Sequence, residues 1–127
     1  MTDSIISAEL RKRLRDWVQT ADQEYVCKVD FDADFAGFEG HFPGNPIVPG
    51  VCLIELSRVM AEQAAGLELV LQEISLCKFR HPIMAGMTAD CKLLLRRLDG
   101  PAFLIQTEIK TESGPAGQMR LKAGIRS

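Results

Sequence analysis

Residues 51–66, VCLIELSRVMAEQAAG, carry the clearest structural signal of the sequence. Residues 51–65 contain neither Gly nor Pro, and apolar side chains occur almost all around the helix that they would form. A helix that is apolar on nearly every side is buried rather than laid on a surface. Gly66 is a natural residue to end it. The sequence therefore predicts one central, buried helix over residues 51–65.

The residues that follow this helix alternate between apolar and polar side chains, as strands do. The predicted strands are residues 69–79, 88–98, 102–111 and 118–126. Turn signals separate them, at His81-Pro82 and Gly86, at 99–101 (DGP) and at 113–115 (SGP). Long consecutive strands joined by hairpins indicate an antiparallel sheet. Such a sheet with one buried helix predicts an α+β domain in which the sheet wraps the helix.

The residues before the central helix divide into three segments. Residues 7–20 have the period of an amphipathic helix, with Ser7 as a plausible N-cap. Residues 24–32 alternate as a strand would. Residues 35–49 are rich in Gly and Pro and predict no regular element. No repeat or linker interrupts the chain, so we expect a single domain over residues 1–127.

Composition narrows the classes of function. The chain has 127 residues, of which 46% are hydrophobic. Its net charge of −2 does not suit a protein that binds nucleic acid. No apolar run resembles a secretory signal or a membrane-spanning helix. The four cysteines are widely spaced, which favours reduced thiols over a metal site or a disulfide framework. We therefore expect a cytoplasmic protein.

The segment before the central helix carries the candidate chemistry. Pro43, Pro46 and Pro49 recur every third residue and should stiffen the chain into an extended path. That path would hold His41, whose imidazole gains and loses a proton near neutral pH, at a defined place. The helix that begins near Gly50 offers unpaired N–H groups to an oxygen that acquires negative charge.

Glu55 lies on the central helix among apolar residues, where a carboxyl group can hold a proton near neutrality. A second interpretation is open, because Glu55, Arg58 and Glu62 share one helical stripe and could form ion pairs. His41 could equally be structural. Cys52 could be an activated thiolate at the helix N-terminus, although a small core residue is the better interpretation.

The run FEGHFPGNPIVPGVCLIE, residues 38–55, resembles the active-site signature of the β-hydroxyacyl-ACP dehydratases of the FabZ/FabA type. In that family an acidic residue follows the histidine by fourteen positions, which is the separation of His41 and Glu55. The run KFRHPI, residues 78–83, is similar to the family's K-F-R-x-P-V segment.

This resemblance implies a hot-dog fold, in which the sheet wraps the central helix. The helix predicted over residues 7–20 would be an extra N-terminal element. The resemblance also implies dimers in which His41 of one subunit faces Glu55 of the other, and assemblies of such dimers. His41 would be the base, Glu55 the acid, and the Gly50 N–H would polarise the thioester carbonyl. The carbonyl of Ile47 would help to orient His41. The residues expected to contact the substrate are Phe42, Ile47, Pro49 and Val51.

The resemblance further implies an acyl carrier protein, with its phosphopantetheine-linked acyl group, as partner, and neither cofactor nor metal. Glu at position 55 looks like the non-isomerising branch. The carrier is acidic, so a basic surface is expected. Its candidates are Arg80, Arg96, Arg97, Arg120, Lys122 and Arg126.

Departures from the family pattern point away from housekeeping fatty-acid synthesis. Val59 stands where the family has glutamine, residues 85–87 read AGM where it has P-G-D, and residues 7–20 replace its usual opening. We expect a specialised lipid, polyketide or aryl polyene pathway. Two alternatives stay open: an acyl thioesterase on the same fold, and a non-catalytic subunit that binds acyl chains or supports a partner enzyme.

Overall fold

The computed structural model describes residues 4–39 and 46–126. Within these residues, two α-helices, one 3₁₀ turn and six strands follow one another. Their order is α1 (Ile5–Arg13), β1 (Leu14–Ala21), β2 (Glu24–Phe31), η1 (Ala36–Phe38), α2 (Gly50–Ala65), β3 (Leu69–Phe79), β4 (Met87–Arg97), β5 (Ala102–Thr111) and β6 (Gly114–Ile125).

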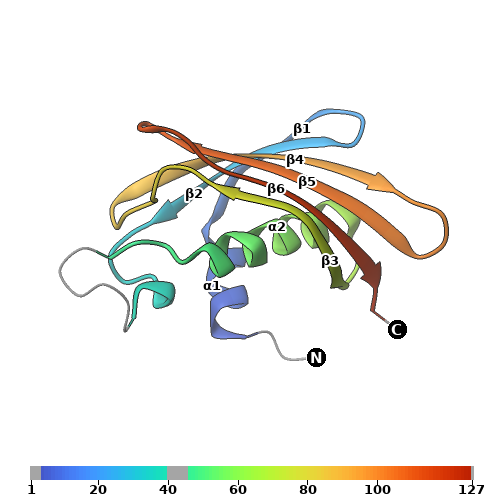
Figure 1. Ribbon diagram of the computed structural model, residues 1–127, viewed down its shortest axis with the longest axis horizontal. Coiled ribbons are helices and arrows are strands. Elements are labelled where there is room, and N and C mark those ends of the chain that lie inside the picture. The colour runs from blue at the N-terminus through green and yellow to red at the C-terminus, as the bar shows by residue number, and fades with distance from the viewer. Residues whose placement is uncertain (1–3, 40–45, 127) are drawn as a thin grey trace.

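One antiparallel sheet wraps helix α2 (Figure 1). Its strand order is β1-β2-β4-β5-β6-β3, so β1 and β3 are the two edges. Helix α1 lies against α2 on the side away from the sheet (Figure 1). The α+β class, the wrapped helix and the extra N-terminal helix are confirmed.

Helix α2 is buried as its composition predicts. Leu56, Val59 and Met60 are fully buried, and Leu56 and Met60 belong to a core cluster that also includes sheet residues and Leu10 of α1. Gly66 closes the helix in the left-handed conformation, with φ of 69°, and its N–H donates to the Glu62 carbonyl at 2.8 Å. A residue with a side chain would be strained at this φ, which explains why the helix ends there.

The predicted helix over residues 7–20 is wrong in its second half. Helix α1 ends at Arg13, and its N-cap is Ser4, whose hydroxyl accepts from the Ser7 N–H, so Ser7 is not the cap. Residues 14–21 form strand β1, which pairs with β2. The ring of Trp17 stacks on that of Tyr25 with 5.4 Å between centroids. Pairing with a neighbouring strand thus outweighs the helical period.

Two smaller differences concern turns. In the segment that was predicted to be irregular, residues 35–49, the described residues Ala36–Phe38 form a 3₁₀ turn. Strand β6 begins at Gly114, before the predicted start at residue 118, because the hairpin turn is only Glu112-Ser113. Pro115 then lies inside the strand, opposite Lys110 at a register irregularity. Such an irregularity tolerates a residue that has no N–H to donate.

Candidate functional site

The N-terminus of α2 has no side-chain cap. Pro49 occupies the cap position without a side-chain hydrogen bond, and the first turn holds no acidic residue. Cys52 N–H donates to the Pro49 carbonyl, whereas the described residues supply no acceptor for the Gly50 N–H. Unpaired N–H groups and the helix dipole make this end electropositive. It is therefore suited to an oxygen that gains negative charge.

The residues just before Gly50 are pinned to the chain after β3. Val48 N–H donates to the Ile83 carbonyl at 2.8 Å, and Ile47 forms an isolated bridge with Met84. Val48 is buried. These contacts fix where α2 begins, and with it the half-buried Ile47 and Pro49.

The ring of Phe79, at the end of β3, lies against Gly50. A Cβ atom added at Gly50 would stand 2.5 Å from Cε2 of this ring, which is closer than real Cβ contacts. Glycine at this position therefore lets the ring cover the helix backbone closely.

Glu55 is held on one oxygen. The Ser7 hydroxyl donates to its Oε1 at 2.8 Å, Arg58 Nε donates to the same oxygen at 2.9 Å, and Arg58 Nη2 is also bonded to it. The Glu55 side chain is 28% exposed. The interpretation of Glu55 as an ion-paired residue is thus confirmed for the single chain. The sequence suggested apolar surroundings for Glu55, whereas the side that faces Ser7 and Arg58 is polar.

A buried charge network continues from Arg58. Arg58 Nη1 donates to the Leu69 carbonyl at 3.1 Å and contacts Glu62 Oε2 at 2.7 Å. Glu62 is 8% exposed and also accepts from the Leu69 N–H at 2.7 Å and from Arg11. The spacing of Glu55, Arg58 and Glu62 along one face of α2 predicted the ion pairs within that helix. The contacts from Ser7 and Arg11 on α1 were missed, since no spacing rule connects these residues with α2.

Apolar side chains are exposed beside this site. Val51, in the first turn of α2, is 70% exposed, and the edge strand β3 exposes Val70, Ile74 and Phe79. A long edge strand with unpaired backbone groups and exposed apolar residues is a template for another chain. His41 and Phe42 lie outside the described residues, so their expected places relative to Glu55 stay predictions.

Cys52 is a core residue rather than a nucleophile. Its side chain is buried, and burial, followed by the charge of Glu55, raises the pKa of its thiol. A raised pKa disfavours the thiolate. All four cysteines are free. Within residues 4–39 and 46–126, no three His, Cys, Asp or Glu side chains are grouped so that they could hold a metal ion.

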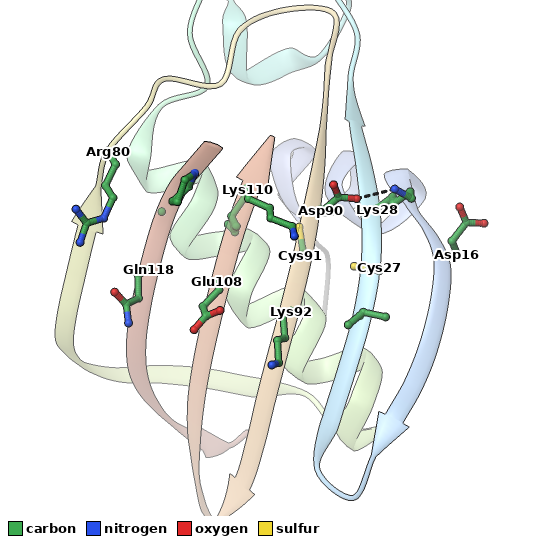
Figure 2. A pocket seen from close by; sticks show the side chains of 14 residues that line it. Asp16, Cys27, Lys28, Arg80, Asp90, Cys91, Lys92, Glu108, Lys110 and Gln118 are labelled. Carbon is green, nitrogen blue, oxygen red and sulfur yellow. Dashed lines mark hydrogen bonds and ion pairs between the residues drawn. The ribbon is translucent and has the colours of Figure 1, made fainter. Parts of the chain in front are cut away.

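A hollow of about 690 Å³ lies on the outer face of the sheet, away from α2 (Figure 2). Charged side chains such as Lys92 and Glu108 point into it while α2 passes behind the strands, and α2 contributes none of its lining residues. Arg80 is the one carrier-docking candidate that lines it. The hollow is therefore separate from the predicted acyl site. In the described part of the chain, no helix combines the length and the apolar character needed to cross a membrane.

Comparison with known proteins agrees with this architecture. Residues 17–114 match the ApeI-like family, described as ApeI dehydratase. A 3-hydroxyacyl-[acyl-carrier-protein] dehydratase FabZ of Ehrlichia ruminantium is 30% identical over 80% of this chain and 74% of its own length. The FabZ of Syntrophobacter fumaroxidans is also 30% identical, over 69% of this chain and 65% of its own length, so the match spans just under two thirds of that relative.

Among solved structures, the dehydratase heterocomplex ApeI:P from Xenorhabdus doucetiae superposes with a TM-score of 0.76. The match covers 87% of this chain and 96% of that one at 23% identity, which supports the hot-dog fold and no more. The family match over most of the chain and the relatives at 30% identity agree with the signature at residues 38–55. The chain therefore belongs to the ApeI-like, FabZ-related hot-dog dehydratases.

Proposed function

We propose that this protein removes water from a (3R)-3-hydroxyacyl thioester on an acyl carrier protein and yields the trans-2-enoyl thioester. The proposal rests on the place where the sequence signature runs into the start of helix α2. The signature at residues 38–55 ends on a helix whose N-terminus is uncapped and whose Gly50 N–H is without an acceptor in the described residues. Glu55 follows five residues later, about 7–8 Å along the helix axis.

In the proposed reaction His41 takes the proton from C2. The electron pair of that C–H bond forms the C2–C3 double bond, and the C3–O bond breaks. Glu55, directly or through a water molecule, gives a proton to the departing hydroxyl, which leaves as water. The Gly50 N–H stabilises the negative charge that develops on the thioester oxygen. The carbonyl of Ile47 orients His41.

Arg58 holds Glu55 by one carboxylate oxygen, which fixes the position of the proposed acid on α2. A partner subunit that covers this face, together with a bound acyl chain, would close the site to water. The proposed acid role is thus tied to the closed, substrate-loaded dimer.

The proposed dimer places His41 of one subunit opposite Glu55 of the other. Its support is apolar exposure, at Val70, Ile74 and Phe79 on the edge strand β3 and at Val51 in the first turn of α2. Burial of these side chains would both remove apolar surface from water and enclose the helix end. Pro49, Val51 and Phe42 would then line the acyl tunnel. The proposed role in a specialised lipid, polyketide or aryl polyene pathway rests on the departures at Val59 and at residues 85–87.

The purified protein, given 3-hydroxyacyl-ACP substrates that differ in chain length and unsaturation, should form the enoyl product by mass spectrometry. His41→Ala and Glu55→Gln should each lower turnover by about 100-fold or more, since each removes a proton-transfer group. Asp22→Asn, in the exposed turn between β1 and β2, is the matched surface control. Robust turnover by both site variants would overturn the assignment.

The same assay separates the alternatives. Release of free thiol from acyl-ACP without enoyl product would indicate a thioesterase. An isolated protein that is inactive, yet restores dehydration when mixed with a second subunit, would indicate a supporting role. That outcome has a parallel in the Xenorhabdus neighbour, which is described as a dehydratase heterocomplex.

A further inference from the structure

The carboxylate of Glu55 is bonded asymmetrically. All hydrogen bonds that the described residues make to it end on Oε1, from the Ser7 hydroxyl and from Nε and Nη2 of Arg58. Oε2 is left for a partner from outside the described chain. An acid that must meet a substrate from one direction needs this arrangement, in which one oxygen is anchored and the other presented.

The guanidinium of Arg58 is itself fixed before it reaches Glu55. One edge, through Nη1, binds the Leu69 carbonyl at 3.1 Å and Glu62 Oε2 at 2.7 Å. Because the guanidinium is planar and rigid, fixing one edge fixes the direction of the other. That other edge carries the Nε and Nη2 that hold Glu55.

Ser7 reaches the same oxygen from a different element. It lies on α1, is 4% exposed, and its hydroxyl bonds to both Glu55 Oε1 and the Ser4 hydroxyl, each at 2.8 Å. Arg11, one turn further along α1, is bonded to Glu62 on α2. The N-terminal helix is therefore cross-linked by polar contacts to the helix that carries the acid.

We propose that Ser7 and Arg58 are positioning residues that clamp Oε1 of Glu55, so that α1 is part of the active site and Oε2 alone faces the C3 hydroxyl. This inference rests on the proposed function. It adds that the N-terminal helix controls the rate of the chemical step rather than the binding of the acyl chain.

The test is steady-state kinetics on 3-hydroxyacyl-ACP with full-length Ser7→Ala, Ser7→Thr, Arg58→Gln and Arg58→Lys. Loss of the clamp should lower kcat about tenfold or more and change KM by less than about twofold, since the acid is misaligned while substrate contacts remain. Ser7→Thr keeps a hydroxyl and should recover most of the kcat that Ser7→Ala loses. Arg58→Lys keeps the positive charge but loses the paired Nε and Nη2 donors, so its kcat should stay low.

Arg13→Gln is the matched control. Arg13 is 16% exposed against 15% for Arg58 and is likewise ion-paired, but its partners are Glu9, Asp32 and Asp34, away from Glu55. It should lose thermal stability and keep kcat within about twofold. Removal of Arg58 deprives the buried Glu62 of a partner and can unfold the protein. The Ser7 variants then decide the matter, because they leave that pair intact.

Wild-type kcat in Ser7→Ala and in a folded Arg58→Gln would overturn the clamp, and so would an equal loss in Arg13→Gln. Both results require an active wild-type protein. A wild-type protein without dehydratase activity would overturn the proposed function and the clamp together, so the two failures are distinguishable.

Discussion

A methyl group added at Gly50 would meet Cε2 of Phe79 at 2.5 Å and Cζ at 2.7 Å. The ring would have to leave the helix end, so the surface beside the Gly50 N–H would change. Gly50→Ala should therefore lower kcat/KM about tenfold or more, because the surroundings that hold the thioester oxygen against the polarising N–H are displaced. Steady-state assays with the melting temperature of each variant measure both effects.

Gly124→Ala is the control for this substitution. Its Cβ would meet Gln72 Nε2 at 2.4 Å, an equally short contact, but with the far end of a flexible side chain that can move away. Gly124 lies on β6, away from the start of α2. Turnover by Gly50→Ala equal to that of Gly124→Ala would contradict the role given to Gly50.

At the scale of single residues, the sequence predicted contacts that follow a spacing rule. The ion pair of Glu55 with Arg58 follows from the three-residue separation on one helix. The bond from Ser7 to Glu55 joins residues 48 positions apart, and only the packing of α1 on α2 creates it. The contribution of α1 to the polar surroundings of Glu55 could not be predicted for the same reason.

At the scale of elements, α2 and strands β3 and β5 were predicted with nearly their observed bounds because period, turns and burial agree. Strand β1 was not, since its residues suit a helix as an isolated sequence. Their backbone groups are satisfied by β2, a long-range choice that local periodicity does not report. Asp16, with φ of 54°, marks the irregular register that this pairing requires.

Strand β1 is also attached through an ion pair that depends on pH. Asp30 on β2 accepts two hydrogen bonds from Arg15 on β1, at 2.6 and 2.9 Å, and one from Thr88 on β4 at 2.6 Å. The hydrogen bond from Arg15, followed by that from Thr88, lowers the pKa of Asp30 from 3.8 to about 2. The stabilisation is therefore fully present above pH 3.8 and is lost as pH falls toward 2.

Urea unfolding of the wild type and of Asp30→Asn at a series of pH values tests this dependence. The wild type should be more stable at neutral pH, because it keeps the ion pair. The difference should be small, because the side chains of Arg15 and Asp30 are both exposed to solvent. The difference should shrink between pH 4 and pH 2. A difference that stays constant over this range would contradict the lowered pKa of Asp30.

A pair of buried hydroxyl groups joins α2 to the sheet. The fully buried hydroxyl of Ser57 donates to the Leu53 carbonyl at 3.1 Å and lies 2.7 Å from the Thr107 hydroxyl on β5. Ser57→Ala should lower the free energy of unfolding by about 1–2 kcal/mol, because the Thr107 hydroxyl loses its partner in the core. Chemical denaturation measures this change, while turnover should stay near that of the wild type.

Thr107→Val in the Ser57→Ala background provides the matched cycle. Once one hydroxyl is gone, removal of the other should cost less than it does in the wild type, with a coupling of about 1 kcal/mol. Additive losses would show that the two hydroxyls do not stabilise each other.

At the scale of the whole molecule, the topology leaves one edge of the sheet and one end of the buried helix on the same side. Strand β3 directly follows α2 and lies at the edge, so its end at Phe79 returns to the start of α2 at Gly50. The sheet around the helix was predictable from hairpins and burial. Which edge would stay open was not, because strand order depends on pairing between distant segments.

A site shared by two subunits predicts complementation between inactive variants. In a mixed dimer of His41→Ala and Glu55→Gln subunits, one site combines the intact His41 of one chain with the intact Glu55 of the other, while the second site loses both. Random exchange of equal amounts makes half of the dimers mixed, so activity should return to about a quarter of the wild type. The measurement is enoyl-ACP formation after joint refolding, with each variant refolded alone as the control. If both groups instead came from one chain, no mixed dimer would hold an intact site, and the mixture would stay inactive.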